Sequence, residues 1–272
     1  MKHKKFIGIA LFLLASIAVM VSSCKKEFQR YNKASGLLIT DSDIVKLAQK
    51  HNNYLTEIIK NYNYDSVPDY IENFEKNFIN TALDGLSQTE RIQIIENMKK
   101  RHNQKNNMIP ITSNDLILAI DSCSKFENKD KMIELVNTAT SIIIKDTSTC
   151  AEINSFLDSL FLEKSNNFTK LELIVLKSYF ETLKASANFW YPIERGGTGI
   201  GYAYIQKLHG DKKANIGPLG SALISDASSL GFGMIGVAIA GAVSGPIGWS
   251  ALAIVAGESA ANSGLAAVVA SM

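Results

Sequence analysis

The chain has 272 residues, of which 28 are lysine or arginine, 26 are aspartate or glutamate, and 46% are hydrophobic. The near balance of charge and the lack of a basic block give nucleic-acid binding no electrostatic support. The length suffices for one large or two small domains with a sizeable core.

The N-terminus has the order of zones that export requires. Residues 2–5 are basic, residues 6–23 are uncharged with an apolar core, and the stretch ends in Val21-Ser22-Ser23-Cys24. This ending resembles the lipobox of bacterial lipoproteins. The resemblance implies cleavage between Ser23 and Cys24 and attachment of diacylglycerol to the Cys24 sulfur. The alternative is an uncleaved anchor, since residues 6–23 are just long enough to span a bilayer.

The residues after Cys24 predict the destination. Lys25, Lys26 and Glu27 follow it, and no aspartate stands directly after the cysteine. In Gram-negative lipoproteins an aspartate there commonly means inner-membrane retention, so the resemblance implies an outer-membrane lipoprotein, periplasmic or surface-exposed. Removal of residues 1–23, with their three lysines, leaves 249 residues with 25 basic and 26 acidic side chains.

Two cysteines remain for the folded body. Cys123 and Cys150 could pair in an oxidising compartment, and a disulfide closing this loop would stabilise the fold by roughly 3–4 kcal/mol. The alternative is two buried thiols that never meet. The long spacing excludes a CxxC redox motif or a zinc site built on one.

The first half of the body has helical periodicity. Residues 24–40 suit a tether. The first predicted helix has acidic residues at 41 and 43 and an apolar stripe at spacings of three and four: Ile44, Leu47, Ala48, His51, Leu55, Ile58, Ile59 and Tyr62. A second helix follows Pro68 and ends near Gly85. A third opens with the capping box 87–90 and buries Ile92, Ile95 and Met98.

Four further helices are predicted. Ser113 caps a short one, residues 129–144 form another, and residues 150–162 form a third. The run 142–144 could equally be a brief strand. The longest helix should run from a capping box at Thr169 to Asn188. No convincing period-2 pattern competes, so the sequence predicts an all-α helical bundle over residues 41–191.

The C-terminal part differs in composition. Residues 192–215 read as a glycine-containing hinge, and ten of the eighteen glycines fall in residues 217–272. Between Asp226 and Glu258 lie 31 uncharged residues. The sequence therefore predicts a Gly/Ala-rich hydrophobic helical hairpin over residues 216–272, turning at Gly245-Pro246.

Small residues recur every fourth position along this hairpin, a spacing that lets helix backbones approach closely. The two rows are Ser229, Gly233, Gly241 and Gly245, and Gly236, Ala240, Ser244 and Gly248. Such composition resembles glycine-zipper domains and the membrane-active halves of some bacteriocins. Three arrangements follow: a hairpin buried against the bundle, insertion in a membrane, or a partly disordered tail held by partner helices.

Signatures of catalysis are missing. His51, His102 and His209 are far apart in sequence, and no HExxH, P-loop or GxSxG motif occurs. The glycine-rich run 196–201 follows a proline break and reads as a hinge better than as a phosphate cradle. We expect no metal, cofactor or catalytic residue, and an envelope lipoprotein that acts by interaction or structure. The alternative is a membrane-active, toxin-like or pore-forming protein working through the hairpin.

Overall fold

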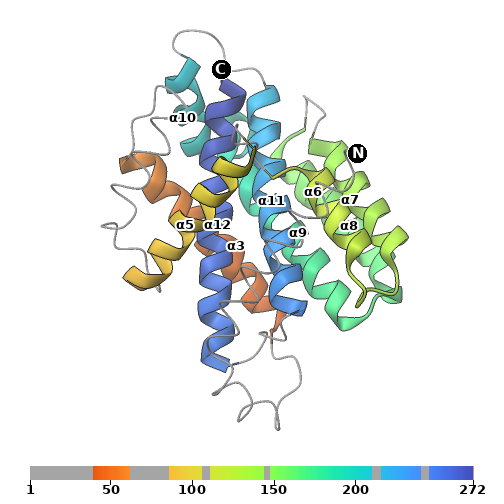
Figure 1. Ribbon diagram of the computed structural model, residues 1–272. Coiled ribbons are helices and arrows are strands. Elements are labelled where there is room, and N and C mark those ends of the chain that lie inside the picture. The colour runs from red at the N-terminus through yellow and green to blue at the C-terminus, as the bar shows by residue number, and fades with distance from the viewer. Residues whose placement is uncertain are drawn as a thin grey trace.

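The computed structural model describes residues 39–61, 86–105, 111–143, 148–209, 216–239 and 245–271. Within these ranges every regular element is a helix, which confirms the predicted all-α class (Figure 1). The signal peptide with Ser23 and Cys24, the tether up to residue 38, and the helix predicted after Pro68 lie outside the described residues. Ala240, Gly241 and Ser244 of the small-residue rows also lie outside them.

The described part of the chain forms nine helices. In chain order they are α3 (Asp41–Asn61), α5 (Gln88–Lys105), α6 (Ser113–Ser122), α7 (Lys129–Ile143), α8 (Cys150–Lys164), α9 (Lys170–Trp190), α10 (Ile200–His209), α11 (Ile216–Ile239) and α12 (Gly245–Ser271), with 3₁₀ turns η1 (Ser165–Asn167) and η2 (Ile193–Arg195).

Capping boxes fix where several helices begin. The predicted box at Ser87 forms, since its N–H donates to Glu90 Oε2 at 2.7 Å. The predicted box at Thr169 forms as well. At α6 the cap is Thr112, not the predicted Ser113, because it is the Thr112 N–H that donates to Asp115 Oδ2 at 2.9 Å. These bonds satisfy backbone groups that a helix N-terminus leaves unpaired.

The hairpin α11–α12 forms the centre of the bundle. Helix α11 packs mainly on α12 and α9, and α12 packs on α11 and α3. Figure 1 shows α11 and α12 side by side in the middle, with α6, α7 and α8 on one side and α5 on the other. All side chains of residues 225–237 are buried. A helix that is apolar on every face is stable in water only when neighbours cover it. Of the three predicted arrangements, the structure has the hairpin buried in the bundle.

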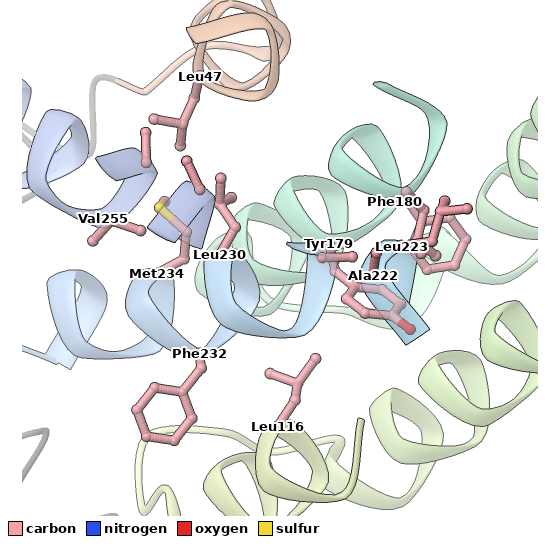
Figure 2. Packing of buried hydrophobic residues seen from close by; sticks show 14 of the residues in the cluster. Leu47, Leu116, Tyr179, Phe180, Ala222, Leu223, Leu230, Phe232, Met234 and Val255 are labelled. Atoms are coloured by element: carbon pink, nitrogen blue, oxygen red, sulfur yellow. The ribbon is translucent and has the colours of Figure 1, made fainter. Parts of the chain in front are cut away.

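Large apolar side chains from several helices close around α11. Figure 2 shows this packing for Leu47, Leu116, Tyr179, Phe180, Ala222, Leu223, Leu230, Phe232, Met234 and Val255. The core therefore joins elements from both halves of the chain, from α3 near residue 47 to α12 near residue 255.

Several predicted details are wrong. On α5, Ile94 is buried while the predicted core residue Ile92 is 41% exposed. The helix predicted over residues 129–144 is confirmed, since residues 142 and 143 end α7 and the alternative strand does not form there. Among the described helices the longest is α12 with 27 residues, not α9 with 21. Gly245 and Pro246 open α12 instead of forming the turn, in keeping with the tolerance for proline in a first helical turn.

One buried carboxylate ties the start of α9 to the loop before α7. Glu172 is fully buried and accepts hydrogen bonds from the backbone N–H groups of Glu127 (2.6 Å), Asn128 (2.7 Å) and Thr169 (2.7 Å), and from the Asn128 side chain (3.0 Å). Burial alone would raise the pKa of Glu172, but the hydrogen bonds from Asn128 and Thr169 hold it below its usual value.

We expect Glu172→Gln to lower the free energy of unfolding by about 2 kcal/mol at pH 7, because the loop donors lose an ionised acceptor. Urea denaturation measures this loss. Because the pKa of Glu172 is depressed in the folded protein, its contribution is present above the usual glutamate range and is lost on acidification, so the gap should close at acid pH. The control Glu152→Gln, which replaces an exposed carboxylate at the same capping position of helix α8, should cost less. Equal losses for the two variants would contradict this account.

Candidate functional site

Polar side chains from four helices meet inside the bundle. His51 of α3, Trp190 of α9, Asp226 of α11, and Ser259 and Ser263 of α12 are each buried, with at most 1% of the residue exposed. We call these five residues the polar cluster. It is the strongest candidate site in the described part of the chain, because it brings two buried titratable side chains close together among hydrogen-bonding groups from four helices.

Asp226 is the centre of the polar cluster. Its Oδ2 accepts a hydrogen bond from the indole Nε1 of Trp190 at 2.7 Å, and its backbone carbonyl accepts one from Ser259 Oγ at 2.8 Å. Its Oδ1 lies 3.6 Å from Nε2 of His51. Burial raises the pKa of the Asp226 carboxyl well above its usual value, while the Ser186 hydroxyl and the Trp190 indole oppose that rise.

His51 faces α12 with one ring nitrogen and its own helix with the other. Nε2 lies 3.5 Å from Ser263 Oγ, and Nδ1 lies 3.0 Å from Oδ1 of Asn52. Burial lowers the pKa of His51 to about 4, against the opposing effect of the Asn52 contact. The prediction that His51 belongs to the core stripe of its helix is confirmed.

The polar cluster contains a serine, a histidine and an aspartate, but it does not have the geometry of a catalytic triad. In a triad the serine and the aspartate contact different ring nitrogens, so that the aspartate orients the imidazole while the other nitrogen accepts the serine proton. Here Ser263 and Asp226 both face Nε2, and Nδ1 faces an amide. The three side chains are also fully buried, so a substrate has no access to them.

The predicted cysteine pair does not form. Cys123 and Cys150 are both buried and free. The Cys150 thiol donates to the carbonyl oxygen of Ala187 at 3.3 Å, and burial raises its pKa to about 11. A thiol with such a raised pKa is a poor nucleophile at neutral pH, so Cys150 packs as a small apolar side chain.

The small-residue spacing produces close helix contacts where the structure describes it. A Cβ added at Gly233 would lie 2.5 Å from Cγ1 of Val255, so the Val255 side chain of α12 packs directly against the backbone of α11 there. Ile94 of α5 packs against Gly257 of α12 in the same way, since a Cβ added at Gly257 would lie 2.8 Å from Cδ1 of Ile94. Ser229 and Gly236 are buried within α11, and Gly245 and Gly248 belong to the first turns of α12.

We expect Gly233→Ala to lower the free energy of unfolding by about 2 kcal/mol, because the new methyl group overlaps Val255. In a double-mutant cycle, adding Val255→Ala should recover part of this loss by removing the overlapping branches. Urea denaturation of the four proteins gives the coupling. Strictly additive losses would show that the glycine does not serve this contact.

The glycine-rich run after α9 is a closed loop. The N–H groups of residues 196–199 all donate to carbonyl oxygens of residues 188–193, at 2.7–3.1 Å. A phosphate cradle needs such N–H groups free to face the ligand, so this loop does not supply one. The region predicted as a hinge, residues 192–215, also contains helix α10, which was not predicted from the sequence.

The sequence did not predict that the residues of the polar cluster lie together. Asp226 was visible as the last charge before the uncharged stretch, and His51 as the polar member of an apolar stripe. Nothing in sequence spacing joins residues 175 positions apart. In the part of the chain that the structure describes, no three His, Cys, Asp or Glu side chains are placed to hold a metal ion.

A search for relatives found no matching protein-family model, no matching curated protein and no matching solved structure. Across the described ranges, none of the helices has a stretch that is both long and apolar enough to cross a membrane.

Proposed function

We propose that this chain is a lipid-anchored protein of the bacterial envelope whose helical body acts by binding or structural support, without catalysis. Cys24 carries the lipid and holds the protein at the outer membrane. The placement of Asp226 supports the role of the body, because its hydrogen-bonding partners Trp190 and Ser259 lie on other helices of the bundle.

The polar cluster favours a stable bundle over an inserted hairpin. Asp226 lies near the middle of α11, and Glu258 and Asn262 lie near the middle of α12. At the centre of a bilayer an aspartate costs about 2.5–3.5 kcal/mol on insertion scales. Leaving the bundle would also break the bond between Asp226 and Trp190. In the bundle, by contrast, Asp226 Oδ2 accepts a hydrogen bond from Trp190, and neighbouring helices cover the apolar faces of the hairpin.

Dye release from liposomes tests this part of the proposal. Residues 24–272 with Cys24→Ser, which carry neither the apolar leader nor a lipid, should leave dye-filled vesicles intact at neutral pH, because the hairpin stays in the bundle. A pore-forming peptide added to the same vesicles provides the positive control. Release of dye by the purified chain, increasing with its concentration, would overturn the binding role.

Mass spectrometry of cell-derived protein tests the anchor. We expect the mature chain to begin at Cys24 and to carry acyl groups, and the Cys24→Ser variant to carry none. Two or three acyl chains hold durably, because burial contributes about 0.8 kcal/mol per CH₂. A chain that retains its initiator methionine and carries no acyl mass would overturn the anchor.

Membrane activity through the hairpin is the second candidate. It is favoured by the 31 uncharged residues between Asp226 and Glu258 and by the tight contact of Gly233 with Val255, which would let α11 and α12 leave the bundle together. The dye-release experiment separates the two candidates, since only a membrane-active protein would empty the vesicles.

A further inference from the structure

The orientation of one amide fixes the tautomer of His51. Asn52 Nδ2 donates to the carbonyl oxygen of Ala185 on α9 at 2.8 Å, which leaves Asn52 Oδ1 as the atom 3.0 Å from Nδ1 of His51. Turning the amide over would place two carbonyl oxygens against each other. Because Oδ1 can only accept a hydrogen bond, Nδ1 of His51 must carry a hydrogen.

The other ring nitrogen then needs a proton that no neighbouring hydroxyl supplies. Ser263 Oγ donates its one hydrogen to the carbonyl oxygen of Ser259 at 2.8 Å, so it cannot also donate to Nε2. The remaining neighbour is Asp226 Oδ1 at 3.6 Å. Without a proton in this gap, the lone pair of Nε2 would face an ionised carboxylate in an apolar core, which is costly.

We propose that the facing side chains of His51 and Asp226 together bind a single proton, at Nε2 or at Oδ1, and that this proton stabilises the packing of the hairpin α11–α12 on α3. The proton count is the same whether it resides on the carboxyl or on the imidazole, because a coupled pair binds protons as a unit. The pair thus works as a proton-dependent lock, by which we mean that its proton stabilises the contact between α3 and the hairpin. Loss of the proton at alkaline pH weakens this contact.

No charged side chain in the described ranges contributes to the pKa shifts of His51 and Asp226. Asp226 is influenced by burial, Ser186 and Trp190, and His51 by burial and Asn52, with no charged side chain among these influences. The helices that supply the cluster carry other titratable groups near it in sequence. These are Lys50 and Tyr54 on α3, Tyr191 after α9, and Glu258 on α12.

The sharing sets an unusual pH dependence. The unfolded chain has ordinary pKa values of about 3.9 for aspartate and 6.5 for histidine. Between about pH 4 and 6.5 the unfolded pair holds one proton, as the folded pair does. In this range the pair therefore does not make the free energy of unfolding depend on pH. Above pH 6.5 the unfolded chain loses its proton while the folded one keeps it. The unfolding constant then rises by up to tenfold per pH unit.

Asp226→Asn tests the lock in the full, unlipidated Cys24→Ser chain. The amide can still accept from Trp190 and donate to Nε2, so the variant keeps the hydrogen-bonding shape but not the titration. We expect the ratio of its unfolding constant to that of the background protein to fall about tenfold per pH unit between pH 5 and 8. The control Asp158→Asn, an exposed carboxylate paired with Lys184, should give a ratio that stays nearly constant with pH.

Nitrogen NMR of His51 gives a readout that does not depend on the variant folding. In the background protein we expect Nδ1 to stay protonated and the ring shifts to stay constant from pH 5 to 8. A ring that titrates near pH 6.5, or a ratio for Asp226→Asn that does not change with pH, would overturn the shared proton. Neither result bears on the lipid anchor or on dye release, so the proposed function is tested separately.

Discussion

Replacing Trp190 with alanine is expected to lower the free energy of unfolding by about 4 kcal/mol or more. The indole is fully buried at the end of α9, and removing a buried tryptophan leaves a large cavity. Its Nε1–H also donates to Asp226 Oδ2 at 2.7 Å, so the substitution leaves a buried carboxyl without that donor. Urea denaturation, followed by circular dichroism because a tryptophan is lost, measures the effect.

Trp190→Phe separates the two contributions. Phenylalanine fills much of the space but has no N–H, so its cost should be about 1–3 kcal/mol and should come mainly from the unpaired Asp226 oxygen. In a background that already contains Asp226→Leu, Trp190→Phe should cost clearly less. An equal cost in both backgrounds would show that the indole does not act through Asp226.

Gly197→Ala is expected to lower the free energy of unfolding by about 3 kcal/mol or more, the second large effect. A Cβ at this position would overlap the carbonyl oxygen and carbon of Tyr191, which are backbone atoms that no side-chain rotation can move. The closed loop 196–199 would therefore have to open and give up its hydrogen bonds to the end of α9.

Gly196→Ala is the matched control in the same loop. Gly196 has φ +80°, but its added Cβ would meet only Cys150 Cβ at 3.7 Å, an ordinary contact. The cost should be the 1–2 kcal/mol that a side chain pays in the left-handed region. Thermal unfolding of both variants checks the order. A larger loss for Gly196→Ala than for Gly197→Ala would contradict the closed-loop packing.

Local signals in the sequence predicted local structure well. A capping box needs only residues three apart, and those at Ser87 and Thr169 form as expected. The apolar stripe of α3 is buried from Ile44 to Ile58, because spacings of three and four place its members on one face. On α5 the apolar periodicity predicted that Ile92 is buried, but in the structure Ile94 is buried and Ile92 is exposed.

The central position of the hairpin could not be read in this way. Helix α11 has small and apolar residues on all faces, so its pattern does not say which face meets a neighbour, or whether the neighbour is protein or lipid. The answer depends on contacts with α3 and α9, which are distant in sequence. The pairing of His51 with Asp226 depends on the same contacts, and for that reason spacing could not reveal it.

Hydrogen exchange on lipid vesicles tests most directly whether the hairpin remains in the bundle. With the acylated protein anchored on vesicles, we predict that the amides of α11 exchange as slowly as in the unlipidated chain in solution, and that α3 and α9 stay protected with them. Slow exchange in α11 and α12 together with a loss of protection in α3 and α9 would contradict the account, because it would mean that the hairpin has left the bundle for the membrane.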